Sequence, residues 1–188
     1  MQINPRAIPR AVKPNQNEGE SSGSGQSTID VGSTAPAFTL NDAAENLPHH
    51  MSKALERGPL LIGIYKSSCE ASKTTFPFME KLHQAYPALT IWGIAQDSPN
   101  VTRSFTRRTG VSFPMLIDDN NYAVSRAYDI VATPTLFLID RSGVVLWQRM
   151  GFQKASIHEL STVIADLFDV PSVDILAGNE AVPAWVPG

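Results

Sequence analysis

Residues 60–72 read LLIGIYKSSCEAS. The first six form a continuous apolar run of strand length, which is typical of a central strand covered on both faces. Three polar residues follow, and the next one, Cys69, is the only cysteine of the chain. Apolar residues between positions 76 and 86 then recur at intervals of three and four, as on one face of a helix. The stretch therefore predicts a buried strand, a short loop that ends in a thiol, and a helix from Cys69 to about Tyr86, which Pro77 is expected to kink.

The elements on either side of this stretch alternate between strand and helix. Strands are expected at 35–40, 89–95, 113–117, 135–139 and 144–149, and helices at 51–57, after 100 up to Gly110, at 121–128 and at 155–168. Alternation of this kind favours parallel strands joined by right-handed crossovers. The last two strands flank the turn 140–143 and predict an antiparallel hairpin. The fold class is α/β, with a mixed central sheet that has a parallel half and helices on both faces.

Composition limits the classes of protein that fit. With 188 residues and 43% hydrophobic content, the chain is long enough to bury one core, and a net charge of −3 argues against nucleic-acid or membrane partners. One cysteine excludes an intramolecular disulfide. We expect three parts: a disordered arm at 1–30, a domain at 31–168 and an extension at 169–188, in which Trp185 is a candidate anchor.

No apolar run has the length of a signal peptide or a membrane-spanning helix, so a cytoplasmic protein is expected. Two polar clusters were weighed as metal sites. The pair His49-His50 is more simply interpreted as part of a solvated loop, and Asp118-Asp119 as a helix-capping turn. No metal or other cofactor is predicted.

Cys69 is the candidate that carries chemistry. A thiol between a central strand and the next helix lies at the carboxyl edge of the sheet, where open α/β sheets place their sites. The positive end of the helix dipole would favour its thiolate, whereas the neighbouring Glu70 would oppose it. The alternative is a small buried side chain, since free cysteines are among the most buried residues.

Two further motifs lie at matching distances from this thiol. A proline stands eight residues after Cys69, and Ala132-Thr133-Pro134-Thr135 leads into an apolar strand. With the segment 69–72, these motifs resemble the thioredoxin superfamily, and the long spacing from Cys69 to Pro134 is similar to its redoxin branch of AhpC/TSA-like and TlpA-like domains. The segment 32–38 also resembles a redoxin amino terminus. The resemblance implies a thioredoxin-like fold, an insertion within 89–110, a cis Pro134, and a backbone at Thr133 that pairs with an extended substrate segment.

The sequence departs from the family pattern at three positions. Ser72 stands where dithiol members have a second cysteine, so this chain has no internal thiol to release a mixed disulfide. Ile62 and Lys66 stand where peroxiredoxins have a proline and a threonine or serine. Ser72 is either a hydrogen-bond partner of the thiolate or an ordinary first-turn residue, and Lys66 either stabilises negative charge or is a solvated lysine.

Three functions remain open for this pattern. The first is a monothiol oxidoreductase or antioxidant that acts through Cys69, with Ser72 and Lys66 as catalytic candidates and Thr133 and Pro134 as substrate-binding candidates. It would use an external thiol reductant such as glutathione or a thioredoxin, and a protein disulfide or a peroxide as substrate. The alternatives are a one-cysteine peroxidase and a non-catalytic binding module. The oligomeric state is left open.

Overall fold

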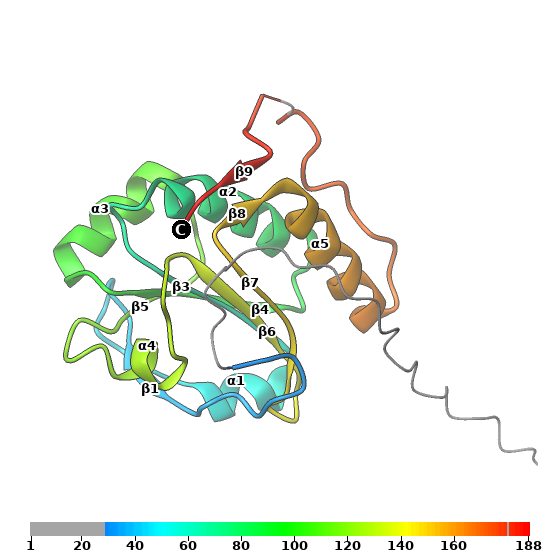
Figure 1. The fold of residues 1–188 in the computed structure, drawn as a ribbon. Coiled ribbons are helices and arrows are strands. Elements are labelled where there is room, and N and C mark those ends of the chain that lie inside the picture. Colours follow the sequence, from blue (N-terminus) through cyan, green and yellow to red (C-terminus); the bar gives the residue numbers. More distant parts are fainter. Residues whose placement is uncertain (1–28, 180) are drawn as a thin grey trace, which may run out of the picture.

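A five-stranded sheet with helices on both faces forms the centre of the molecule (Figure 1). The computed structural model describes residues 29–179 and 181–188, so the predicted arm lies outside the described residues except for its last two. The strands are β3 (Leu60–Tyr65), β4 (Thr90–Ala95), β5 (Met115–Ile117), β6 (Thr135–Ile139) and β7 (Val145–Met150). The helices are α1 (Met51–Arg57), α2 (Glu70–Ala85), α3 (Pro99–Thr109), α4 (Ala123–Ala127) and α5 (Lys154–Phe168). These elements confirm the predicted fold class.

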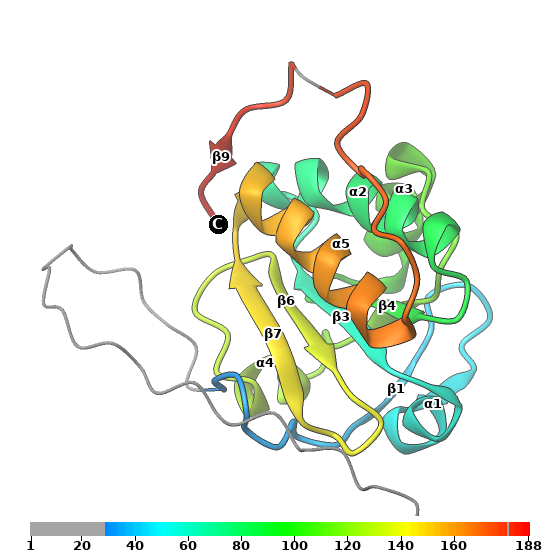
Figure 2. The ribbon, with the colours of Figure 1, turned by 90° about the vertical axis from the view of Figure 1, so that its right-hand side faces the viewer.

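The strand that follows Pro59 lies in the middle of the sheet. The strand order is β5-β4-β3-β6-β7, and every residue of β3 is buried. β3 runs parallel to β4 and antiparallel to β6, and β6 and β7 form the predicted hairpin (Figure 2). Since β4 and β5 are also parallel, the carboxyl ends of β3, β4 and β5 lie at one edge of the sheet.

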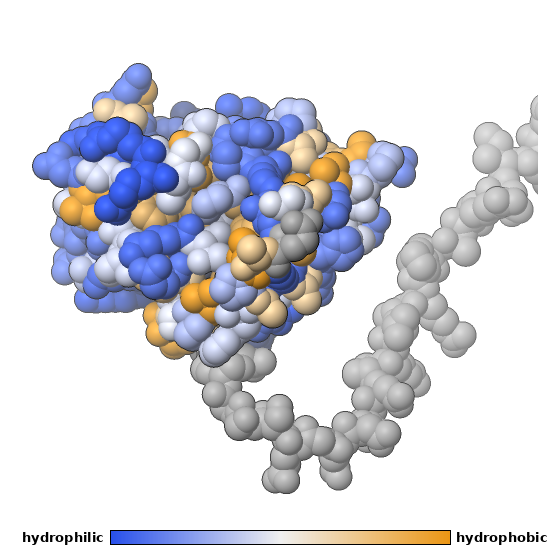
Figure 3. Space-filling model, turned by 90° about the horizontal axis from the view of Figure 1, so that it is seen from above, coloured by the Kyte–Doolittle hydropathy of each residue, from blue (hydrophilic) through white to orange (hydrophobic). Residues whose placement is uncertain are grey.

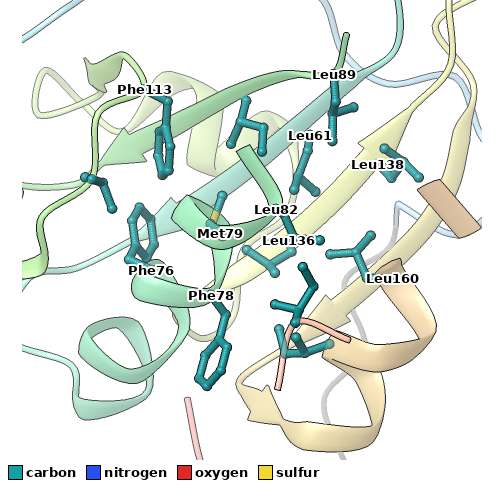
Figure 4. Close-up of a cluster of buried hydrophobic side chains, with 14 of the residues drawn as sticks. Leu61, Phe76, Phe78, Met79, Leu82, Leu89, Phe113, Leu136, Leu138 and Leu160 are labelled. Atoms are coloured by element: carbon teal, nitrogen blue, oxygen red, sulfur yellow. The ribbon is translucent and has the colours of Figure 1, made fainter. Parts of the chain in front are cut away.

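Two hydrophobic clusters cover the two faces of the sheet. Alternate residues of β3 point to opposite faces, so that Leu61 belongs to the cluster under α2, α3 and α5, whereas Ile62 belongs to the one that includes α1 and α4. Figure 4 shows the first cluster, in which α2 packs on the sheet. Its labelled members are Leu61, Phe76, Phe78, Met79, Leu82, Leu89, Phe113, Leu136, Leu138 and Leu160.

Two glycines let α2 approach the sheet closely. Gly63 of β3 and Gly93 of β4 are paired side by side. A Cβ atom at Gly93 would lie 2.5 Å from the sulfur of Met115, and one at Gly63 would lie 2.9 Å from Cε of Met79. The two glycines therefore determine how closely α2, and the thiol at its start, approaches the sheet. The helix continues through Pro77.

The strand expected at 35–40 begins later and is shorter than predicted. The strand is β1 (Thr39–Asn41), and it pairs with β2 (Pro48–His50) in a separate two-stranded sheet instead of extending the main one. The reason is a tight turn around Asp42, whose carboxylate accepts hydrogen bonds from the amides of Ala44, Glu45 and Leu47. This turn folds the chain back onto β2, while Asp42 and Ala43 pair with Leu116 and Met115 of the edge strand β5.

The extension after α5 packs on the domain, although not through its tryptophan. Ile175 is buried in the cluster under α2 and α5, and its carbonyl oxygen accepts a hydrogen bond from Nζ of Lys81. Trp185 is 58% exposed, so it does not anchor the extension to the domain. The end of the extension forms β9 (Trp185–Val186), which pairs with β8 (Phe152–Gln153). None of the described helices is both long and apolar enough to cross a membrane.

Candidate functional site

Cys69 is the N-cap residue of α2, at the carboxyl end of β3. Its thiol is half-buried and donates a hydrogen bond to the carbonyl oxygen of Thr133, with 3.0 Å between Sγ and the oxygen. Its own carbonyl accepts the first bond of the helix, from the amide of Lys73. The sulfur therefore lies at the positive end of a sixteen-residue helix, where the dipole and the free amides favour a negative charge.

The segment that accepts the thiol hydrogen bond is held firmly. The peptide bond between Thr133 and Pro134 is cis, as the family resemblance implied. The Thr135 hydroxyl donates to the carbonyl of Ala132, and the amide of Gly151 donates to the carbonyl of Pro134. These bonds tie the loop to the start of β6 and to the end of β7, so the Thr133 carbonyl has a fixed position opposite the thiol.

A carboxylate from the neighbouring strand fixes the loop that carries the thiol. Asp97 follows β4, and its Oδ2 accepts a hydrogen bond of 2.6 Å from the amide of Ser67. The amide of Gln96 donates to the carbonyl of Tyr65 at the end of β3. The sequence analysis missed Asp97 as a site residue, although it follows a strand parallel to β3, and the carboxyl ends of such strands meet at one edge.

Ser72 and Lys66 take different positions relative to the thiol. Ser72 lies on the first turn of α2 and is completely buried, and its Oγ has no hydrogen-bond partner among the residues that the structure describes. Residues three apart share a helix face, so the Ser72 hydroxyl is on the same side of the helix as Cys69. Lys66 is exposed. Its carbonyl oxygen accepts a hydrogen bond from the Cys69 amide, and this is the one hydrogen bond between the two residues in the described part of the chain.

The histidine pair is built into structure, which corrects its interpretation as a solvated loop. Both residues belong to β2. Nε2 of His49 lies 3.1 Å from Oδ2 of Asp42, and the ring packs edge-on against Trp92. Nδ1 of His50 lies 3.0 Å from the hydroxyl oxygen of Thr39. Within 29–179 and 181–188, no group of three His, Cys, Asp or Glu side chains is placed to hold a metal ion.

Asp118 has the capping role that its sequence predicts. Its side chain is buried and accepts hydrogen bonds from the amides of Val124 and Ser125 and from the Ser125 hydroxyl. With all these donors paired, the carboxylate holds the start of α4. The side chain of Asp118 is therefore engaged in the turn that precedes α4.

A surface cavity of about 520 Å³ lies outside the thiol region. Its lining includes Arg103, Arg107 and Phe113 but neither Cys69 nor Pro134. Arg103 is already bonded to the carbonyl oxygen of Ala43. The candidate site for chemistry is therefore the thiol and its loop, and not this cavity.

Comparison with known proteins shows the family of the chain. The model of the AhpC/TSA family matches residues 31–148, which is more than half of the chain. The chain belongs to the AhpC/TSA family. This match contains Cys69, Thr133 and Pro134 and ends within β7.

Curated relatives of this family member have thiol chemistry in their names. The chain is 29% identical over 123 residues to thiol-disulfide oxidoreductase ResA of Geobacillus thermodenitrificans, which covers 64% of this chain and 69% of that protein. It is 28% identical over 144 residues to ResA of Bacillus subtilis, which covers 74% of this chain and 79% of that protein.

Solved structures share the fold. A thiol:disulfide interchange protein DsbE described as putative, from Chlorobium tepidum, superposes with a TM-score of 0.68 at 25% identity over 74% of this chain and 99% of its own. Peroxidoxin BcpB of Mycobacterium tuberculosis has a TM-score of 0.64 at 19% identity over 77% of this chain and 99% of its own, which shows the fold alone. Family, relatives and thiol geometry together support a thiol redox function.

Proposed function

We propose that the protein is a monothiol oxidoreductase that uses Cys69 as its nucleophile and an external thiol as its reductant. The observation that carries the proposal is the half-buried thiol at the start of α2, bonded to the Thr133 carbonyl oxygen 3.0 Å away. A carbonyl oxygen accepts a hydrogen bond from the thiol but repels the thiolate. Ionisation therefore frees the sulfur from this contact and turns it toward a reaction partner.

The reaction has two exchange steps. The Cys69 thiolate attacks one sulfur of a substrate disulfide, the S–S bond breaks, and the second sulfur leaves as a thiolate that takes up a proton. The product is a mixed disulfide between Cys69 and the substrate. A thiolate of the external reductant then attacks the substrate sulfur of this mixed disulfide, so that a disulfide forms between reductant and substrate and Cys69 leaves as a thiolate. An external thiol is needed because Ser72 replaces the second cysteine and provides no internal thiol.

Ser72 is proposed as the hydroxyl that stabilises the ionised sulfur. Among the described residues its buried Oγ has no partner, and a buried hydroxyl of this kind costs free energy. Such a group suggests that another chemical state of the site uses the hydroxyl as a donor. The thiolate is such a state, because it accepts hydrogen bonds that the neutral thiol does not attract. Lys66 is proposed only as a long-range source of positive charge, since its side chain is exposed.

The partners of the reaction follow from the chemistry and from the relatives. ResA is named as a thiol-disulfide oxidoreductase, so we propose a protein disulfide as substrate. A low-molecular-weight thiol such as glutathione, or a thioredoxin, is proposed as reductant. We propose the cytoplasm as the compartment, because such thiols are kept reduced there.

Oxidation by two reagents tests the proposal directly. Stopped-flow measurements would compare how fast hydrogen peroxide and a small aromatic disulfide consume the Cys69 thiol, with Cys69→Ser as the blank. Monothiol exchange predicts rapid reaction with the disulfide and slow reaction with peroxide. The reverse order identifies a one-cysteine peroxidase, in which the thiolate attacks the peroxide, yields a sulfenic acid and releases water.

A non-catalytic binding module gives a third result. In that case iodoacetamide would alkylate Cys69 in the folded protein no faster than in the same chain unfolded in denaturant at the same pH. A catalytic thiolate predicts that folding accelerates alkylation by about tenfold or more, since the helix start favours the reactive anion. Equal or slower alkylation in the folded state would contradict the proposed function.

A further inference from the structure

The last residues of the chain run beside the loop that precedes β6 and accepts the hydrogen bond of Cys69. β9 pairs with β8 in antiparallel register, with Phe152 opposite Val186 and Gln153 opposite Trp185. The amide of Lys154 donates to the carbonyl of Ala184 with a distance of 3.0 Å. In both Figure 1 and Figure 2 the end of the chain lies next to the loop that precedes β6.

This end reaches the carbonyl that bonds the thiol. A Cβ atom at Gly188 would lie 2.9 Å from the Thr133 carbonyl oxygen and 3.2 Å from Cβ of Ala132. A Cβ atom at Gly151 would lie 3.2 Å from the carbonyl oxygen of Val186 and 3.3 Å from the Gly188 amide. Only glycine leaves room for so close a passage of two backbones.

The inner part of the extension delivers the tail to this position. Ile175 is buried, and Val182 packs on the same cluster. Lys81 of α2 donates to the carbonyl oxygens of Ile175 and Ala177. Because these contacts tether the extension a few residues upstream, the tail has a high effective concentration at the loop.

We propose that residues 184–188 are an intramolecular ligand of the thiol site, which an extended polypeptide must displace before its disulfide can reach Cys69. The inference rests on the proposed function. It assigns the surface made by Ala132, Thr133, Gly151 and β8 to an extended backbone, held by the tail at rest and by the substrate chain during exchange. Small oxidants are expected to need no such displacement, because Cys69 is only partly buried.

The tail is held weakly enough to be displaced. Its strand has two residues, and Trp185 is 58% exposed and adds little buried area. A strand of this length is marginal by itself and depends on its neighbours. Figure 3 shows that the face seen from above in Figure 1 has small apolar patches separated by hydrophilic residues. Backbone pairing is therefore the main attraction that this face offers to a polypeptide.

Two variants of the full protein test the proposal. Gly188→Leu places a side chain against the Thr133 carbonyl oxygen and lifts the tail end, whereas a truncation after Pro183 removes the tail and leaves the anchor at Ile175. Trp185→Ala is the matched control, because it removes an exposed side chain and keeps the backbone pairing. Each protein is mixed with oxidised insulin and, separately, with a small aromatic disulfide, and single-turnover loss of the Cys69 thiol is followed by mass spectrometry.

The expected result is selective. Gly188→Leu and the truncation react with insulin about tenfold faster than the parent protein, as when the open state is populated to about a tenth. Their rates with the small disulfide, and both rates of Trp185→Ala, stay within about twofold, a spread that corresponds to about 0.4 kcal/mol. Hydrogen exchange adds a readout: the amides of 152–154 lose protection in the truncated protein.

Three outcomes overturn the proposal. If insulin and the small disulfide are accelerated equally, the tail only shields the sulfur and does not occupy a polypeptide site. If neither rate changes, the tail has no role at the thiol while the proposed function stands. If no protein reacts with either disulfide, the proposed function itself fails, and this inference fails with it.

Discussion

The carboxyl ends of β3 and β5 lie at the same edge of the sheet, but the polar side chains that follow them differ in how completely they are hydrogen-bonded. After β5, Asp118 is buried and accepts three hydrogen bonds from Val124 and Ser125. After β3, within the described part of the chain, the buried Ser72 hydroxyl has no partner and the Cys69 thiol has one hydrogen-bond acceptor. A buried polar group with all its partners stabilises one conformation, whereas an incomplete set leaves capacity for a second chemical state.

β4 ends between these two regions, and the residue that follows it stabilises the loop before Cys69. The Asp97 carboxylate accepts a hydrogen bond from a backbone amide of this loop, as the Asp118 carboxylate does from an amide of α4. Cys69 and Ser72 therefore follow a loop whose backbone is held by hydrogen bonds. Substitutions at the two ends should accordingly separate chemistry from stability.

Cys69→Ser gives the largest expected effect. A hydroxyl is not ionised at neutral pH, so we expect the rate of disulfide turnover with an external thiol to fall at least about 10³-fold. The free energy of unfolding should change by less than about 1 kcal/mol, because a single half-buried hydrogen bond is exchanged for another. Turnover assays and urea unfolding measure the two quantities. Ser68→Ala, one residue away and exposed, is the control that should retain both.

Asp118→Ala should reverse this pattern. It leaves two buried amides and a hydroxyl without an acceptor, so we expect the free energy of unfolding to fall by about 3 kcal/mol. Urea denaturation checks the loss, with the exposed neighbour Asp119→Ala as the control. Alkylation of Cys69 in the variant that remains folded should keep its rate. A stable Asp118→Ala protein would remove the contrast between the two strand ends.

Asp42 extends the comparison to a pH measurement. Burial acts to raise the pKa of Asp42, but hydrogen bonds from the Glu45 amide, from His49 and from the Ala44 and Leu47 amides outweigh it and lower the pKa. A lowered pKa in the folded state contributes stability above the pKa of the unfolded chain, about 4, and this contribution is lost as the pH falls through the lower folded value.

The stability of the protein should therefore decrease below about pH 4, and Asp42→Asn should weaken that dependence. Thermal melting between pH 7 and pH 2.5 measures it, and Glu45→Gln, an exposed carboxylate in the same turn, is the control. If the melting temperature of Asp42→Asn depends on pH as steeply as that of the parent, the hydrogen bonds of the turn contribute nothing measurable.

Two buried serines provide the finest comparison. Ser125 donates to Asp118, so Ser125→Ala should lower the free energy of unfolding by about 1 kcal/mol. Ser72→Ala removes an unpaired hydroxyl and should leave stability unchanged within about 0.5 kcal/mol or raise it. If Ser72 stabilises the thiolate, the same variant slows disulfide exchange about fivefold, which corresponds to about 1 kcal/mol. Equal losses of stability in both variants would show that Ser72 is a structural residue.

Much of the fold and of the thiol site could be predicted from the sequence, because local patterns determine it. The apolar run 60–65 predicted the central strand, and the thiol after it was predicted at the start of a helix, as found at Cys69. The family resemblance supplied the cis Pro134, which local reasoning alone does not predict. The first strand was misplaced because a turn around one side chain, Asp42, overrode the strand propensity that precedes it.

The sequence by itself determined the order of the elements, the position of the thiol and the lack of a second one, since each depends on residues close together in the chain. Only the tertiary structure decided which distant groups surround the thiol region: the Thr133 carbonyl contacts the sulfur, the Asp97 carboxylate holds the amide of Ser67, and Gly188 lies beside the Thr133 carbonyl. Their contacts are made by backbone atoms or by single polar side chains across 30 residues or more. Such contacts leave no periodic signal in the sequence, because they depend on how strands pair and where loops pass.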